Sequence, residues 1–357
     1  MANRASRNGE IELLRFVFAV FVVLRHAPEY GDSFSGGSLG VDFFFLLSGF
    51  LMLKSMSKLN NQEISTARLE TSFLLHKLGS FFPELLLSVC LGGLMFALAH
   101  TDQIGLAIAR MEHSVFSDIL LLKATGLVQW GGGFNGPVWY LSSMMMGIAL
   151  LFPLFRKYGC RLEWLALTIL GLGALLLSTH ELTWPNFELL GTNKGNIRGI
   201  LELSLGCFCY YAVKAANRYE FSTLLRSLLT IAKYAAIAFI MYAIISGNTH
   251  LHGKLLVASA FTIMATMSGQ TYGTSLFTNK LCCFLGRLSL PLYLVHRPVS
   301  YISRRVSLEL FGDISSLDRL YIYLALSLMM CIVLYYGGRA IRRFFASLPA
   351  GTFVRPR

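Results

Sequence analysis

Charged residues are scarce in this sequence. Only 14% of its 357 residues are Asp, Glu, Lys or Arg, whereas hydrophobic residues make up 55%. Soluble domains carry charge on about a quarter of their residues, so this composition excludes an ordinary soluble globular protein. The hydrophobic residues recur along the whole chain in blocks of about 17 to 25, the length with which an α-helix crosses a bilayer.

Two further features are missing, and each absence reduces the number of possible fold classes. The apolar runs lack the strict alternation of β-barrel strands, and no linker or low-complexity tract divides the chain. We therefore expect an all-α polytopic membrane bundle in a single domain over 1–357, with a core at 11–340 and a basic cytoplasmic tail at 339–357. About ten transmembrane helices are expected, at 11–28, 38–56, 80–99, 137–155, 162–179, 197–216, 227–246, 253–268, 284–303 and 320–338. The apolar stretch 114–128 is expected to form a short outer-face or re-entrant element.

Cysteine is sparse as well. The seven cysteines lie mostly inside apolar runs, which is typical of small buried side chains rather than of disulfides. Cys282 and Cys283 lack the spacing of a metal site, so we expect no metal. A cleavable signal peptide is not expected, because residues 2–9 lead straight into a full-length span without a small-residue cleavage site.

Basic residues are the exception to the scarcity of charge. Lys and Arg number 31 against 19 Asp and Glu, which gives a net charge of +12. If the N-terminus is cytoplasmic, most of these basic residues fall in inner segments, as membrane proteins prefer. The distribution indicates an even number of spans with both termini cytoplasmic, and it favours a membrane explanation of the charge over nucleic-acid binding.

The first span contains RFVFAVFVVLRHA at residues 15–27, with ionisable groups at a depth where they are costly. Arg15 and His26 are eleven residues apart, so they share one helix face and stand about 16 Å apart along the axis. Arg15 is then expected near the inner interface and His26 in the outer half. The alternative is that Arg15 extends to the headgroups and His26 only caps the helix end.

Polar residues also occupy two other spans. Asp42 lies near the start of GVDFFFLLSGFLM, residues 40–52. There it either balances the helix dipole or orients a neighbouring imidazole for acid–base catalysis. Ser48 and Gly49 favour the close approach of another helix. Arg198 and Glu202 are four residues apart in the sixth span, so we expect them to form an ion pair.

Further segments follow these two spans in a recognisable order. They are FLLHKLGSFFPELL (73–86), FNGPVWYLSSMMMGIALLFP (134–153) and LGRLSLPLYLVHRPV (285–299). Together with the two opening spans, they resemble the acyltransferase-3 family of integral membrane O-acyltransferases, and the matches reach from residue 11 to 299. Two stretches depart from the family pattern: its usual arginines are replaced by His76-Lys77 and Ser80, and its frequent glutamate after Trp139 by Ser142, Ser143 and Met144.

The resemblance implies a donor, an acceptor and a set of roles. The donor is cytoplasmic acetyl-CoA, and the acceptor is a hydroxyl of a glycan or lipid-linked saccharide, of the O-antigen or lipopolysaccharide type, outside a bacterial inner membrane. His26 acts as the general base, and Asp42 is its possible orienter; a covalent acyl-histidine intermediate is the less favoured variant. The implied donor contacts are Arg15, Lys77 and Ser48, and the implied acceptor contacts are Trp139, Tyr140, His296 and Tyr293.

Two alternatives stay open at this point. A transporter or exporter of a lipid-linked glycan also uses buried charges, although transporters often contain internal repeats and the two halves of this chain show no clear similarity. The second alternative is an acyltransferase that moves succinyl or a longer acyl group. The width of the pore would decide which acyl group is moved. Four histidines fall in predicted outer loops, where surface exposure is expected: His113, His180, His250 and His252.

Overall fold

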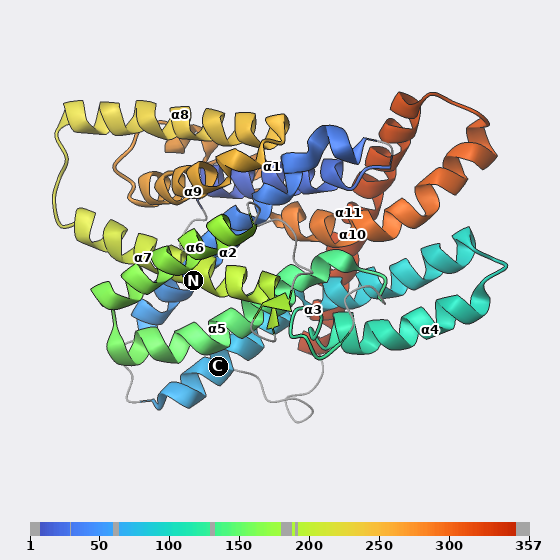
Figure 1. The fold of residues 1–357 in the computed structure, drawn as a ribbon, viewed down its shortest axis with the longest axis horizontal. Helices are drawn as coiled ribbons and strands as arrows, with labels where there is room; N and C mark the ends of the chain where they lie inside the picture. The colour runs from blue at the N-terminus through green and yellow to red at the C-terminus, as the bar shows by residue number, and fades with distance from the viewer. Residues whose placement is uncertain are drawn as a thin grey trace.

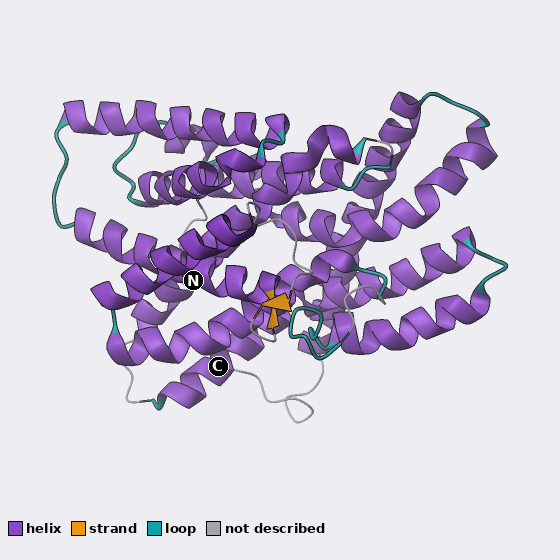
Figure 2. Ribbon diagram, in the orientation of Figure 1, coloured by secondary structure: helices purple, strands orange, loops and turns teal. Residues whose placement is uncertain are grey.

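The computed structural model describes residues 8–28, 30–59, 64–128, 133–179, 188–189 and 192–347. Helices dominate these ranges (Figure 2), and a short antiparallel pair, β1 (Glu188–Leu189) and β2 (Thr192–Asn193), is the one sheet among them. The helices are α1 (Gly9–Arg25), α2 (Gly40–Leu59), α3 (Thr66–Ala99), α4 (Ile104–Ser114), α5 (Trp139–Tyr158), α6 (Leu162–Thr179), α7 (Lys194–Ala216), α8 (Thr223–Ser246), α9 (His252–Met267), α10 (Lys280–Phe311) and α11 (Ser316–Ser347).

The polytopic helical fold is confirmed. Each of the ten predicted spans coincides with one helix, namely α1 to α3 and α5 to α11. Six described segments are long and apolar enough to cross a membrane: Ser33–Lys58, Thr66–Ala99, Gly136–Tyr158, Gly195–Ala216, Thr223–Ser246 and Ser316–Ser347. Of the other predicted spans, α1 and α9 are short, with 17 and 16 residues, and α10 contains two prolines.

Several boundaries differ from the predictions. Helix α3 begins at Thr66 rather than at residue 80, because its polar first turns extend the helix beyond the apolar run that was used to place the span. The stretch 114–128 is helical only at its start, where a π-helical turn over Val115–Ile119 follows α4. Residues 1–7 and 348–357 lie outside the described ranges, so the cytoplasmic location of both termini stays a prediction.

The packing is built around two helices. Helix α10 contacts α1, α3 and α11, and α7 contacts α2, α5, α6 and α9. Figure 1 shows α10 and α11 as one hairpin and α8 beside α9. Gly49 of α2 lies against the backbone of Leu203 in α7, where a Cβ atom would overlap the Leu203 carbonyl. The predicted close helix approach at Gly49 is therefore confirmed.

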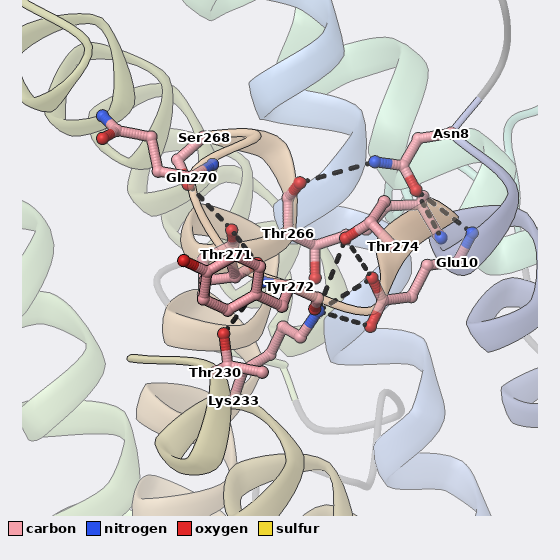
Figure 3. Close-up of polar contacts among 12 residues, drawn as sticks. Asn8, Glu10, Thr230, Lys233, Thr266, Ser268, Gln270, Thr271, Tyr272 and Thr274 are labelled. Atoms are coloured by element: carbon pink, nitrogen blue, oxygen red, sulfur yellow. Dashed lines mark hydrogen bonds and ion pairs between the residues drawn. The ribbon is translucent and has the colours of Figure 1, made fainter. Parts of the chain in front are cut away.

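The start of α1 is held by buried polar contacts that the sequence did not reveal (Figure 3). The Nζ of Lys233 in α8 lies 2.9 Å from a carboxylate oxygen of Glu10, and the Thr274 hydroxyl donates to Glu10 at 2.7 Å. Lys233 also donates to the Tyr272 carbonyl at 3.2 Å. These bonds connect α8 and the segment after α9 to the first turn of α1, five residues before Arg15.

Candidate functional site

The position and hydrogen bonding of His26 leave one ring nitrogen available as a base. His26 is the C-cap of α1, and its Nδ1 lies 2.9 Å from the carbonyl oxygen of Val22. Because a carbonyl only accepts, Nδ1 carries the proton and donates it in this bond. The neutral ring then presents an unprotonated Nε2, for which the described residues offer no hydrogen bond.

A second histidine lies directly beside the first. The ring centroid of His296 in α10 is 4.9 Å from that of His26, and His296 is fully buried. The backbones of Tyr293 and Leu292 lie close to the His296 ring, but neither ring nitrogen meets the geometry of a hydrogen bond to a described residue. Tyr293, one turn earlier on α10, lies 5.9 Å from His296 between ring centroids. An unsatisfied imidazole at this depth costs free energy, which marks the histidine pair as a place for a polar ligand.

A cavity of about 150 Å³ opens on the α1 side of Tyr293. It brings together all three predicted donor contacts with two predicted acceptor contacts, and its lining includes Arg15, Ser48, Lys77, Tyr140 and Tyr293. The Ser48 hydroxyl lies 3.2 Å from the Tyr140 hydroxyl. We call this space the inner cavity; what it binds stays a prediction.

The inner cavity adjoins a wider one of about 570 Å³, since both are lined by Arg15, Leu47 and Leu51. Lys54 and Lys58 line the wider cavity, and they are one helical turn apart on α2. The sequence showed both lysines only as basic residues of an inner segment. Their i,i+4 spacing was a signal that they share a face.

Asp42 does not lie where the orienter prediction required. One carboxylate oxygen pairs with Arg198, and the other lies 2.8 Å from Nε2 of His252. Among the described contacts none joins Asp42 to His26, because Asp42 faces α7 and α9 rather than α1. The Val22 carbonyl fixes the His26 ring instead.

The contacts around Asp42 test two more predictions made from the sequence. Arg198 Nε lies 2.8 Å from Glu202, so the predicted i,i+4 ion pair is confirmed. The prediction that His252 is a surface histidine is wrong: its side chain is fully buried in the contact with Asp42. The ring of Trp139 lies 5.8 Å from the Arg198 guanidinium, and its role as an acceptor contact stays a prediction.

The segment before α5, residues 134–137, forms hydrogen bonds to α10 on either side of His296. Pro298 has no N–H to donate to the carbonyl of Leu294, four residues earlier, and Asn135 Nδ2 donates to that carbonyl at 2.7 Å. On either side, the Tyr293 hydroxyl donates to the Pro137 carbonyl at 2.8 Å and the Tyr301 hydroxyl to the Phe134 carbonyl at 3.0 Å. Two sequence motifs 150 residues apart thus form one structural unit, in which side chains replace the bond that proline removes.

Comparison with known proteins gives one clear result. No curated protein and no solved structure matches the chain. A family model described as an acyltransferase domain matches residues 8–336, which include α1 to α10, the histidine pair and both cavities. This match covers nearly the whole polytopic bundle, and the chain therefore belongs to the Acyl_transf_3 family of acyltransferases.

Proposed function

We propose that this membrane acyltransferase is an O-acetyltransferase, which moves an acetyl group from cytoplasmic acetyl-CoA to a hydroxyl of a cell-envelope glycan. Its membrane would be a bacterial inner membrane. The observation that carries the proposal is the unprotonated Nε2 of His26, oriented by the Val22 carbonyl and lying beside the unpartnered ring of His296. A general base needs this combination of a fixed ring and a free lone pair.

In the proposed reaction, Nε2 of His26 takes the proton of the acceptor hydroxyl as its oxygen attacks the thioester carbonyl carbon. The new C–O bond forms, the C–S bond breaks, and the thiolate of CoA leaves. The imidazolium of His26 then returns its proton to that sulfur. A ring nitrogen of His296 is available to hold the acceptor hydroxyl or the developing oxyanion, because no described residue satisfies it.

The basic residues support a donor that carries phosphates. The wide cavity has Lys54, Lys58 and Arg15 on its lining, and Arg15 and Lys77 line the adjoining inner cavity. Glu12 also lines the wide cavity and pairs with Arg15 at 3.2 Å, so the three lysines carry the free positive charge. Ammonium and guanidinium groups bind phosphate through charge-assisted hydrogen bonds. The nucleotide end of CoA would occupy the wide cavity, and the thin pantetheine arm would pass Tyr293 towards His26.

The test uses the purified full-length protein with radiolabelled acetyl-CoA and a saccharide acceptor. His26→Ala is expected to reduce acetyl transfer by about 10²–10⁴-fold, the usual contribution of general acid–base catalysis. The matched control is His250→Ala, at an exposed histidine far from the pair in the sequence, which is expected to retain full activity.

Three outcomes would change the proposal. Equal transfer by His26→Ala and the wild type would remove His26 from the mechanism. Faster transfer from succinyl-CoA would change the donor. Vesicles that move a lipid-linked glycan without consuming acetyl-CoA would favour the exporter alternative.

A further inference from the structure

A third cavity lies further along α10, on the side of the histidine pair away from Arg15. Its volume is about 430 Å³, and it is lined by Phe96, His100, Arg110, Lys123, Gly133, Gly136, Arg297 and Tyr301. Along α10, Tyr293 lines the inner cavity, the ring of His296 lies 4.9 Å from that of His26, and Arg297 and Tyr301 line this third space. We call it the outer cavity. Its volume falls within the range of about 300–1,000 Å³ that is usual for sites of small ligands.

The lining of the outer cavity is cationic. Arg110, Lys123 and Arg297 reach it, and no carboxylate is among the lining residues that the structure describes. Lys123 is already neutralised, because its Nζ lies 2.6 Å from Asp118 and donates to the Asn135 carbonyl at 3.0 Å. Arg110 and Arg297 have no carboxylate partner among the residues that the structure describes. Two guanidinium groups are therefore available in one cavity.

Aromatic rings hold these two guanidinium groups in place. The Arg110 guanidinium carbon lies 4.6 Å from the centroid of the Phe96 ring, and that of Arg297 lies 5.8 Å from the centroid of Tyr301. Such cation–π contacts position a guanidinium without neutralising it. Its planar donors then remain free for a phosphate or a carboxylate, which they bind in a bidentate manner.

We propose that the outer cavity binds an anionic group, phosphate or carboxylate, of the saccharide acceptor. The inference rests on the proposed function, because it takes the hydroxyl that reaches His26 to belong to the same acceptor. Arg297 directly follows His296, so a saccharide anchored at Arg297 is within reach of the histidine pair. The acceptor class is then a sugar phosphate or an acidic sugar rather than a neutral glycan.

The test measures binding to the full-length protein in phosphatidylcholine nanodiscs, with saturating CoA to fill the inner cavities. The probes are glucose 1-phosphate, glucuronate and glucose. Both charged probes, or the one whose anion the acceptor carries, should bind more tightly than glucose. Arg297→Gln should weaken that binding by about tenfold or more, as for the loss of a hydrogen bond to a charged group. Arg297→Lys should retain part of it, which separates loss of charge from loss of fold.

Arg304→Gln is the matched control, since Arg304 is an exposed arginine of α10 that does not line the cavity. It should leave binding unchanged. Equal binding of glucose and both charged probes, or an unchanged affinity in Arg297→Gln, would overturn the proposal. So would loss of saccharide binding in nanodiscs that contain phosphatidylglycerol, because the cavity would then be a lipid headgroup site. Failure of CoA to bind while glucose 1-phosphate still binds would instead reject the proposed donor and leave the outer cavity standing.

Discussion

Two fully buried histidines of this protein have opposite surroundings. His252 lies in the cluster of α2, α7 and α9, where its ring contacts Asp42 beside the pair of Arg198 and Glu202. His296 lies between α1 and α10, where its ring nitrogens have no partner in the described structure. In the first arrangement each ionisable side chain has a partner within the bundle, and one oxygen of Glu202 is the atom left without a described hydrogen bond. The second leaves hydrogen-bonding capacity for a molecule that comes from outside.

This difference distinguishes buried polar side chains that stabilise the bundle from buried polar side chains that bind a ligand. Ionisable groups in a membrane are costly whichever role they have, so burial alone does not distinguish a structural group from a functional one. The two kinds differ in whether their polar atoms have partners within the protein. We therefore expect substitutions in the Asp42 cluster to act mainly on stability, and substitutions at the histidine pair to act mainly on acyl transfer.

The largest effect on stability is expected from Asp42→Ala. The change leaves the buried Arg198 guanidinium without one of its carboxylates, and breaking a buried ion pair costs about 3–5 kcal/mol. Thermal unfolding of the purified protein should show a large loss of stability. Should unfolding stay unchanged while acetyl transfer falls, Asp42 would act on catalysis after all.

His296→Phe should move stability and activity in opposite directions. The phenyl ring fills a similar space and removes two unsatisfied nitrogens, so the unfolding temperature should hold or rise. Acetyl transfer should fall by about ten- to a hundredfold, as for the loss of one hydrogen bond of about 1.5–3 kcal/mol to a charged transition state. The matched variant is His252→Phe, which should lower the unfolding temperature. Parallel behaviour of the two variants would remove the distinction between the two histidines.

Asn135→Ala should have an intermediate effect. It leaves the Leu294 carbonyl, which Pro298 cannot satisfy, without its donor, at a cost of about 1–3 kcal/mol. Asn135→Asp keeps the size but not the donating amide, so it should not restore stability. The readouts are thermal unfolding and the KM for the saccharide. Full stability of Asn135→Ala would show that the proline-containing turn of α10 needs no support from this residue.

The smallest effect is expected from Tyr140→Phe. It removes the hydroxyl contacts with Ser48 and with the Phe44 carbonyl, and hydrogen bonds between membrane helices contribute about 0.6 kcal/mol on average. Unfolding should therefore change little, and Ser48→Ala combined with Tyr140→Phe should cost less than the sum of the two single changes. Additive losses in this double-mutant cycle would argue against a direct bond between the two hydroxyls.

The sequence predicted the helices and the local pairs well because both depend on short-range periodicity. The ten spans follow from the length of apolar runs, and the Arg198–Glu202 pair follows from a spacing of four residues. The side chains that line the inner cavity were selected through the family resemblance. Their meeting in one space comes from packing between helices, which no spacing within one helix reveals.

The missed contacts are long-range. Asp42 pairs with His252 across 210 residues, and Glu10 with Lys233 across 223. Helical periodicity tells which face of α2 carries Asp42, but not which helix covers that face. The sequence suggested His26 as a partner because Asp42 lies at the outer start of the span that follows His26, whereas α7 and α9 supply its actual partners. The Val22 carbonyl was overlooked because a backbone acceptor leaves no mark in the sequence.

If the outer cavity binds the acceptor, the bond from Asn135 to the Leu294 carbonyl connects that site to the turn of α10 that bears His296. Gly133 and Gly136 line the outer cavity, and Asn135 lies between them. A bound acceptor that moved this short segment would also move the proline-containing turn of α10 that bears His296. Binding of the acceptor would then align the imidazoles, and the thioester would meet a base only when its acceptor is present.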